Sequence, residues 1–491
     1  MATASPVSAG DDDLCFRPAT ELAAMVRAKE VSARELVAAH LDRVERFDGG
    51  LRAFITVTPE RAMVRAAAAD EALAGGDVWG PLHGLPVAHK DLQLTRDVRT
   101  TFGSPIFADF VPEVDSSVVQ RMTAAGAVSL GKTNTPEFGT GSQTYNPLTG
   151  PARNPYDPSC TPGGSSGGAA AALASGMVCL ADGSDMGGSL RNPASFCNVV
   201  GLRPCAGRVP SWPAEIDAFP LAVAGPMART VGDCALLLSV LAGADPRVLE
   251  SLPGDGSEFA GSLASDRAWR VGWCSAPGGL PFDPDVTSVL ESSGRPALLE
   301  AGFAVSDVHP DLSGAEEAFR TWRAWYYAGV LGPLLDEHPD QVNADIRWNI
   351  EEGRRLTTAD LVRASRLRAS VFTSVASVFE DVDVIALPVS QVPPFPATQP
   401  WPTEVAGQPM HTYLDWMRSA YWISATGLPA MSVPCGFTAA GLPVGIQLVG
   451  RPLGELDLLR AALRFESATQ TWRRRPTLAA SSRSDTGAGA P

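Results

Sequence analysis

Residues 161–191 read TPGGSSGGAAAALASGMVCLADGSDMGGSLR and contain two serine sites flanked by glycines. The first is Gly163-Gly164-Ser165-Ser166-Gly167-Gly168, and the second is Gly187-Gly188-Ser189. Glycine lets a backbone adopt conformations closed to other residues and approach a ligand closely. The alanine run at 169–174 predicts a helix, so the first site lies at a helix N-terminus, where unpaired N–H groups point outward. The alternative is a glycine-rich loop that only caps a core helix.

Lysine is rare in this chain, and its positions separate these two interpretations. Of 39 basic residues only Lys29, Lys90 and Lys132 are lysines. Arginine stays protonated in proteins, whereas a buried lysine can be neutral at pH 7 and act as a base. Lys29 lies on a polar helix face, where no special role is expected. Lys90 ends a short apolar stretch, 81–91, that is predicted to form a strand, so it is the better candidate for a base.

Composition limits the classes of protein that this chain can belong to. The 491 residues are 45% hydrophobic and 19% charged, which is typical of a globular protein with a large core. The net charge of -15 argues against nucleic-acid binding, because phosphate contacts need a clustered basic surface. No segment has the features of a signal peptide or a membrane span. Eight cysteines without metal-ligand spacing predict a reduced, cytoplasmic protein with no metal.

The order of predicted elements indicates an α/β protein. Helices are predicted at 20–29, 32–47, 59–74, 116–125, 229–243, 284–301 and 455–472, and strands at 269–274, 431–435 and 444–449. From Gly126 onward helices alternate with short apolar strands, which favours a sheet with helices on its faces. Residues 15–475 are predicted to form one domain between disordered termini at 1–14 and 476–491.

Residues 310–425 are predicted to be the least regular part of that domain. Six of the eleven tryptophans fall in this segment, and a proline-rich run at 388–402 divides it. The aromatic side chains either form core or line the lid of an apolar pocket. We expect the lid to include Trp325, Trp401 and Trp422.

One nucleotide-binding pattern occurs but lacks its structural context. Residues 126–133 match G-x-x-x-x-G-K-[ST] letter for letter. A phosphate-binding loop needs a strand before it and a helix that opens at the lysine. Here a predicted helix precedes the pattern, and Pro136 interferes with a helix starting at Lys132, so nucleotide binding is not expected.

The serine sites and Lys90 together indicate acyl-bond hydrolysis. Such a reaction needs a nucleophile, a base and donors for the developing oxyanion. His83 and His89 are expected to be structural, and no histidine stands in a context typical of a Ser-His-Asp triad. Lys90 is therefore the candidate base. Candidate oxyanion donors are the consecutive backbone N–H groups of Met186, Gly187, Gly188 and Ser189.

Several ordered blocks resemble the amidase signature family of serine hydrolases. They include Gly84-x-Pro86-x-x-x-Lys90-Asp91, Gly131-Lys132-Thr133-Asn134-x-Pro136-Glu137-Phe138, both serine sites, and Gly427-Leu-Pro-Ala-x-Ser-x-Pro-x-Gly436. The resemblance covers roughly residues 20–470. It implies an α/β amidase signature fold, with a mixed, twisted β-sheet covered by helices on both faces, and no metal or cofactor.

The resemblance also implies a Ser-cisSer-Lys triad. Ser189 would be the nucleophile, Ser165 the bridging serine with a cis peptide bond, and Lys90 the base. An acyl-enzyme on Ser189 would form, release the amine and be hydrolysed by water. The residues expected to hold the loop are Ser166, Asp185 and Arg191.

Two positions depart from the glutamine-using relatives in this family. In amidotransferase A subunits an Asp binds the glutamine amino group, ten residues before Gly-Leu-Pro. Met417 occupies that position here, and the nearest acid, Asp415, is two residues away. An Asn of the same block is replaced by Ser424.

These departures favour a stand-alone hydrolase of small apolar or aromatic amides or carbamates, similar to aryl acylamidases or urethanases. Its only expected partner is a small-molecule substrate, with a homodimer left open and with no nucleic acid or membrane. The alternative is an amidotransferase A-type glutaminase subunit that needs partner chains. A catalytically silent binding protein is a third interpretation, against which the intact Lys90, Ser165 and Ser189 argue.

Overall fold

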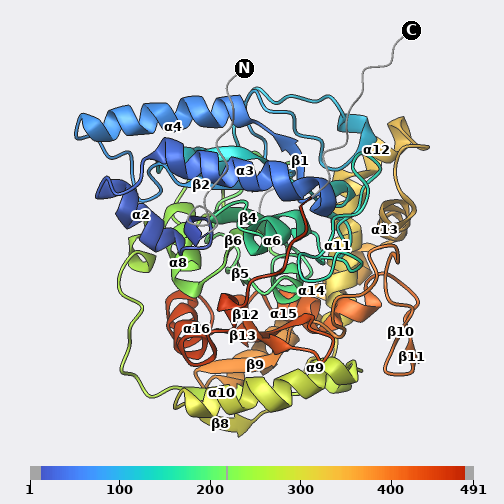
Figure 1. Cartoon of the computed structure of the whole chain (residues 1–491). Coiled ribbons are helices and arrows are strands. Elements are labelled where there is room, and N and C mark those ends of the chain that lie inside the picture. Colours follow the sequence, from blue (N-terminus) through green and yellow to red (C-terminus); the bar gives the residue numbers. More distant parts are fainter. Residues whose placement is uncertain (1–12, 217–218, 481–491) are drawn as a thin grey trace.

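The computed structural model describes residues 13–216 and 219–480, and Figure 1 shows the chain in the colours of its sequence. The disorder expected at the two ends therefore falls mostly outside the described residues. Within the described part, residues 476–480 form no helix or strand.

One large sheet runs through the described part of the molecule. Its eleven strands lie in the order β1-β3-β2-β4-β6-β5-β12-β13-β9-β7-β8. β2 is parallel to both β3 and β4, and β7 is parallel to β8 and β9, while the strands between these groups pair antiparallel. The predicted mixed sheet is thus confirmed. The strands are β1 Phe54–Val57, β2 Pro86–Lys90, β3 Val128–Thr133, β4 Leu180–Asp185, β5 Val200–Arg203, β6 Val223–Ala228, β7 Arg270–Trp273, β8 Ala304–Asp307, β9 Val384–Pro388, β12 Ala430–Phe437 and β13 Pro443–Val449.

Helices cover this sheet on the outside, as Figure 1 shows. They are α2 Ala19–Arg27, α3 Ala33–Leu51, α4 Pro59–Ala74, α5 Ser117–Ala124, α6 Gly167–Ala174, α7 Arg191–Phe196, α8 Val231–Leu241, α9 Pro284–Val289, α10 Arg295–Glu300, α11 Ala315–Val330, α12 Gly332–Glu337, α13 Ala344–Arg354, α14 Thr358–Val378, α15 Arg418–Thr426 and α16 Glu455–Thr469. A separate two-stranded ribbon is formed by β10 Glu404–Val405 and β11 Gln408–Pro409.

Both faces of the sheet are buried, because successive residues of one strand enter different cores. On β4, Leu180 packs with α8 and α16, whereas Ala181 packs with α3, α4 and α6. On β9, Ala386 joins the first core and Leu387 a third one built on α11, α14 and α15. This alternation is the two-residue period of a strand whose side chains point to opposite faces. Helices therefore pack against both faces of the sheet.

Helix α6 lies at the centre of the fold (Figure 1) and consists of glycine and alanine except for Leu173. All eight residues of Gly167–Ala174 are buried. A Cβ atom added at Gly168 would lie 2.4 Å from the backbone N of Asn134 and 2.5 Å from the carbonyl oxygen of Ala53. Position 168 therefore has no room for a side chain, because neighbouring backbone approaches the helix so closely there.

The expectation that residues 310–425 are irregular is wrong. This segment holds α11, α12, α13, α14 and α15, and the 21-residue α14 is the longest of them. Only Ala364, Val371 and Val375 of α14 are buried. Its apolar periodicity is weak for that reason, and the helix is not evident from the sequence pattern. The proline-rich run begins where β9 ends, at Pro388.

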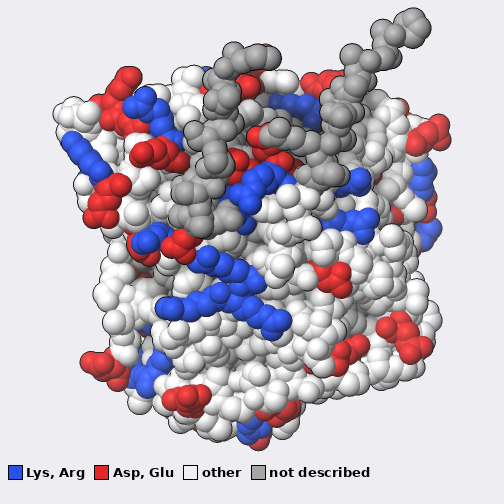
Figure 2. Space-filling model, viewed as in Figure 1, with Lys and Arg blue, Asp and Glu red and all other residues white. Residues whose placement is uncertain are grey.

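Charged groups are not spread evenly over the surface. Figure 2 shows acidic side chains around the rim of one face and a group of basic side chains near its middle, where Figure 1 labels α16 and β12. Net charge alone is therefore a weak argument about which partners can bind. Across the described ranges, no helix combines the length and the apolar character needed to cross a bilayer.

Candidate active site

The candidate site lies where the ends of two neighbouring strands meet the start of a helix. Lys90 ends β2, and Ser184 lies near the end of the parallel strand β4. Parallel neighbours bring their carboxyl ends to the same edge of a sheet. Ser165 and Ser166 come directly before α6, which begins at the same edge.

Lys90 is fully buried and surrounded by serine hydroxyls. Its Nζ atom lies 2.6 Å from Ser165 Oγ, 3.0 Å from Ser166 Oγ and 3.0 Å from Ser184 Oγ. Burial lowers the pKa of the Lys90 ammonium to about 7, although the carboxylates of Asp185 and Asp182 act in the opposite direction. A large fraction of the amine is therefore neutral near pH 7 and can accept a proton.

The two predicted catalytic serines open onto one cavity. Ser165 follows a cis peptide bond from Gly164. Ser165 and Ser189 both line a cavity of about 580 Å³, and Ser189 is 7% exposed. The backbone N–H of Ser166 donates to the Ser189 carbonyl oxygen at 3.2 Å, which ties the two loops together. Within the described ranges no hydrogen bond joins the Ser165 and Ser189 hydroxyls.

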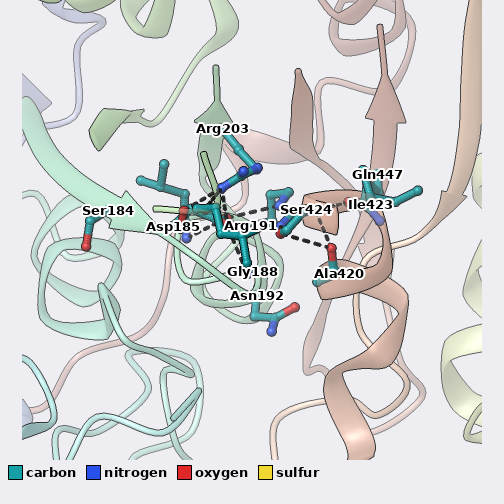
Figure 3. A network of polar contacts seen from close by, with 12 residues as sticks. Ser184, Asp185, Gly188, Arg191, Asn192, Arg203, Ala420, Ile423, Ser424 and Gln447 are labelled. Carbon is teal, nitrogen blue, oxygen red and sulfur yellow. Dashed lines mark hydrogen bonds and ion pairs between the residues drawn. The ribbon is translucent and has the colours of Figure 1, made fainter. Parts of the chain in front are cut away.

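A buried ion network supports the loop that carries Ser189, as Figure 3 shows. Both Asp185 carboxylate oxygens accept from Arg191, each at 3.0 Å, and Arg203 lies 3.4 Å from Oδ1. All three side chains are fully buried. Burial alone would raise the pKa of Asp185, but Arg191 and Arg203 hold it below its ordinary value.

This network reaches across the sheet. Arg191 donates to Ser424 Oγ at 2.7 Å and to Gln447 Oε1 at 2.5 Å, so it connects the serine loop to α15 and β13. Ser424, which replaces an Asn of the glutamine-using relatives, is thus a partner of the loop support. The expected supporting residues Asp185 and Arg191 lie in direct contact with each other.

One predicted oxyanion donor is already engaged in this structure. The Gly188 N–H donates to Asp185 Oδ1 at 2.8 Å. Among the described residues, none accepts the amide hydrogens of Met186, Gly187 or Ser189. These three N–H groups remain as candidate donors, and Gly188 shapes the loop with a φ of 112° that favours glycine.

Two residues near the site escaped the sequence reasoning. Ser184 contacts Lys90 directly, as described above. Asp182 accepts from the Lys90 backbone N–H at 3.2 Å and lies 2.7 Å from His89 Nδ1. The signal that could have found both is their spacing of two residues, which places two polar side chains on one face of a short strand, here β4 beside the Lys90 strand.

His83 and Lys132 have structural surroundings. His83 Nδ1 lies 3.1 Å from the Trp79 N–H and its Nε2 lies 3.0 Å from the Ala69 carbonyl oxygen. Lys132 is buried and donates to the hydroxyls of Thr95 and Thr100. The Gly-Lys-Thr of the nucleotide-like pattern lies inside β3, where no phosphate-binding loop can form. Across the described ranges, no cluster of three or more His, Cys, Asp or Glu side chains could hold a metal.

The tryptophans expected to line the pocket do not line this cavity. Its aromatic wall consists of Phe102, Phe107, Phe138, Phe219, Tyr326 and Tyr327. Trp325 instead packs against Phe219 with the ring centroids 6.2 Å apart. The physical reason is that the indoles of Trp325, Trp401 and Trp422 pack against the third hydrophobic core.

Comparisons with known proteins agree on the family. A family model described as Amidase matches residues 35–459. The A subunit of glutamyl-tRNA(Gln) amidotransferase from Moorella thermoacetica is 38% identical over 494 residues, covering 95% of this chain and 99% of that protein. The protein of the same name from Cupriavidus necator is 37% identical, covering 93% of this chain and 97% of its own length.

Solved structures share the fold. A bacterial aryl acylamidase of the amidase signature family superposes with a TM-score of 0.86 at 28% identity, covering 93% of this chain and 98% of that chain. A 6-aminohexanoate cyclic dimer hydrolase superposes with a TM-score of 0.84 at 27% identity, covering 94% of this chain and 99% of that chain.

These relatives correct two expectations. A stand-alone hydrolase of apolar amides or carbamates is contradicted, because the similar curated proteins are named as amidotransferase subunits. The expected partner set is wrong as well, since it named a small-molecule substrate and left open a homodimer but included no other subunit. The departures at the two positions before Gly-Leu-Pro misled the reasoning because they concern a few side chains, whereas the similarity extends along nearly the whole chain. The strand-end site, the sheet and the matched length together show that the chain is an enzyme of the amidase signature family.

Proposed function

We propose that this chain is the amide-hydrolysing subunit of an amidotransferase and that it releases ammonia from the carboxamide of glutamine. The observation that carries the proposal is its similarity to amidotransferase A subunits over 95% of its length. The buried lysine among serine hydroxyls supports it, because this arrangement suits the cleavage of an unactivated amide.

In the proposed reaction Ser189 Oγ attacks the amide carbon, and its proton passes through the Ser165 hydroxyl to the neutral amine of Lys90. The bond from carbon to nitrogen then breaks, and Lys90 returns the proton to the leaving ammonia. Water, activated along the same path, attacks the Ser189 ester and releases glutamate. The 2.6 Å contact between Lys90 and Ser165 supports this route for the proton.

The negative charge on the tetrahedral intermediate needs hydrogen-bond donors. We assign this role to the N–H groups of Met186, Gly187 and Ser189, whose hydrogens are not taken by other described residues. Asp185 acts through the loop by holding Gly188 and Arg191. Removing a single oxyanion donor lowers kcat by about 10² to 10³ in other serine hydrolases.

A cytoplasmic location fits this function. All eight cysteines are buried, and the seven from Cys160 onward form no disulfide within the described ranges, which is typical of proteins in a reducing compartment.

The proposal is tested by assaying glutamine hydrolysis by the purified chain and then in the presence of the other amidotransferase subunits from the same organism. We expect slow release of ammonia by the chain alone and faster release in the assembly. A fluorophosphonate should add once, and peptide mapping should place the adduct on Ser189. Ser189→Ala should abolish both signals, whereas a fold control, Ser239→Ala at a half-buried position of α8, should retain them.

Two results contradict the proposal. One is the absence of glutamine hydrolysis both alone and with those subunits while another amide is cleaved rapidly. The other is an adduct on Ser165 or Ser166 that survives Ser189→Ala.

A further inference from the structure

A buried arginine in the catalytic cavity lacks an anionic partner among the described residues. Arg323 lies on α11, is 4% exposed and lines the same cavity as Ser165 and Ser189. Its guanidinium donates to Tyr327 Oη at 2.6 Å, to Tyr413 Oη at 2.7 Å and to Met186 Sδ at 3.0 Å. None of these acceptors carries a charge.

Other buried arginines near the site are neutralised. Arg191 and Arg203, both fully buried, share the carboxylate of Asp185. Over the ranges that the structure describes, no carboxylate forms an ion pair with Arg323. Asp345 is a carboxyl group whose pKa responds to Arg323, and burial still raises that pKa. A buried charge without a counter-ion is costly, and an anion bound beside Arg323 would lower that cost.

The guanidinium is held in a fixed orientation toward the serine loop. Two of its nitrogens, Nε and Nη2, face the phenol oxygen of Tyr413, which Asn349 Nδ2 also contacts at 2.7 Å. Tyr327 Oη lies 3.0 Å from Thr140 Oγ1. A guanidinium fixed on one side offers its other side to a ligand at little entropic cost.

The free side of the fork is directed at the residues around the nucleophile. Nη1 has only the thioether of Met186 as its acceptor within the described ranges, and sulfur of this kind is a weak acceptor. Met186 is three residues before Ser189 in the loop that carries the candidate oxyanion donors. A carboxylate that displaced this weak contact would lie within the cavity on the same side as the reacting amide.

Among the described residues, no buried and unpaired carboxylate of the cavity lining is available for an amino group, since Asp185 pairs with Arg191 and Arg203 and the side chains of Glu215 and Glu250 are exposed. Met417 lies where glutamine-using relatives have an acid, and its Cε would be 3.0 Å from a Cβ placed at Gly187. The nearest acid, Asp415, accepts from the backbone N–H groups of His411 and Thr412 and pairs with Arg320. The Asp415 carboxylate is thus already taken by these donors, and Asp415 does not line the cavity.

We infer that Arg323 binds the carboxylate of the substrate, so this site takes carboxylate-bearing primary amides and does not require an α-amino group. The inference rests on the proposed function, since it names the part of glutamine that the cavity recognises. Charge-assisted hydrogen bonds to a buried guanidinium give both affinity and orientation.

The test compares kcat/KM for three amides of one chain length. Glutamine carries the carboxylate and the amino group, glutaramate (4-carbamoylbutanoate) carries only the carboxylate, and pentanamide carries neither. We expect glutaramate to exceed pentanamide by about 10- to 100-fold, the range for hydrogen bonds to a charged group. Arg323→Met should remove that preference and Arg323→Lys should restore part of it. Arg320→Met, one turn earlier and paired outside the cavity, should keep it.

A binding measurement covers the case in which Arg323→Met fails to fold. Glutarate should slow fluorophosphonate labelling of Ser189 in the unaltered chain, whereas 1-pentanol at the same concentration should not.

Three results would each overturn the inference. They are equal rates for glutaramate and pentanamide, a preference that survives Arg323→Met, and no protection of Ser189 by glutarate. Glutaramate cleavage without glutamine cleavage would refute the proposed function and leave the inference intact. Glutamine cleavage that is insensitive to Arg323→Met would refute the inference and leave the proposed function intact.

Discussion

At the scale of single residues, the chemistry depends on a lysine that burial has made a weak base. Lys90 has three hydroxyl partners, and Asp182 and Asp185 are the acidic side chains that act on its pKa. Their carboxylates favour the charged amine, but desolvation is the larger effect and brings the pKa to about 7. The same side chain in an exposed position would be protonated at neutral pH and could not accept a proton.

We therefore expect kcat/KM to rise with pH and to level off above about 7, because only the neutral amine accepts a proton. Lys90→Arg keeps a positive charge but has no accessible neutral form. Its kcat/KM should therefore fall by about 10²- to 10⁴-fold, as in Lys90→Ala. A pH–rate profile on glutaramate or glutamine measures both effects. Substantial activity of Lys90→Arg at pH 8, or a profile that is flat from pH 5 to 9, would show that Lys90 is a fixed charge.

At the scale of elements, the site depends on a helix that fits only because it is small. Helix α6 is buried on all sides, and its N-terminus carries the serine pair. Gly168→Ala would place a Cβ against the backbone of Asn134 and Ala53, which cannot yield as a flexible side chain can. We expect a loss of about 1 to 3 kcal/mol in the free energy of unfolding.

Gly232→Ala provides the matched control. Gly232 lies inside α8, and an added Cβ there meets nothing within 4 Å. Alanine should stabilise that helix by about 0.5 to 1 kcal/mol. Urea unfolding of both variants measures the difference. If the two variants unfold at the same urea concentration, the close approach at α6 is not what limits its size.

The serine loop depends on a second set of elements, joined through Asp185. Asp185→Asn would leave Arg191 and Arg203 buried without their carboxylate, at a cost of about 3 to 5 kcal/mol. Ser424→Ala, which removes one neutral partner of Arg191, should cost about 1 kcal/mol. Thermal unfolding at pH 7 measures the loss of stability in each of the two variants.

The difference in stability between the unaltered chain and Asp185→Asn should depend on pH with a definite sign. Asp185 has a folded-state pKa below its ordinary value, so its contribution is complete above the unfolded pKa of about 4 and is lost as pH falls below it. The gap in stability between the unaltered chain and Asp185→Asn should therefore narrow in acid. A gap that widens in acid would mean that Asp185 does not act as a carboxylate partner of the arginines.

At the scale of the whole molecule, the middle of the sheet is buried, whereas the edge strand at one end is largely exposed to solvent. β13 has a strand on each side and all seven of its residues are buried. β8 is an edge strand with β7 as its single neighbour in the described sheet, and three of its four residues are exposed. Local opening of β8 exposes little apolar surface and so requires little free energy.

Native-state hydrogen exchange should show this contrast. We expect the β8 amides that bond to β7 to exchange at least about 100-fold faster than those of β13, which should open only with global unfolding. Equal protection of the two strands would indicate that the sheet opens as one cooperative unit.

Sequence reasoning succeeded wherever the determining contacts are local. The helix predicted at 32–47 forms α3, which begins with a capping box in which Ser32 Oγ accepts from the Glu35 N–H at 3.1 Å. The helix predicted at 59–74 has the bounds of α4, and the predicted pair of strands near the C-terminus is the antiparallel pair β12 and β13. Caps, glycine stops and strand-like apolar runs act over a few residues, so the chain itself carries the signal.

The family and the mixed α/β fold could be predicted from the amino-acid sequence, because ordered blocks of residues resemble the amidase signature family, and the candidate triad is what that resemblance implies. The helical state of residues 310–425 and the engagement of Gly188 by Asp185 become evident only in the folded chain. The same is true of the partners of Arg323, which come from α11, the serine loop and Tyr413. These features arise from contacts between segments far apart in the chain, and a charge or an N–H group has no partner until folding brings one to it.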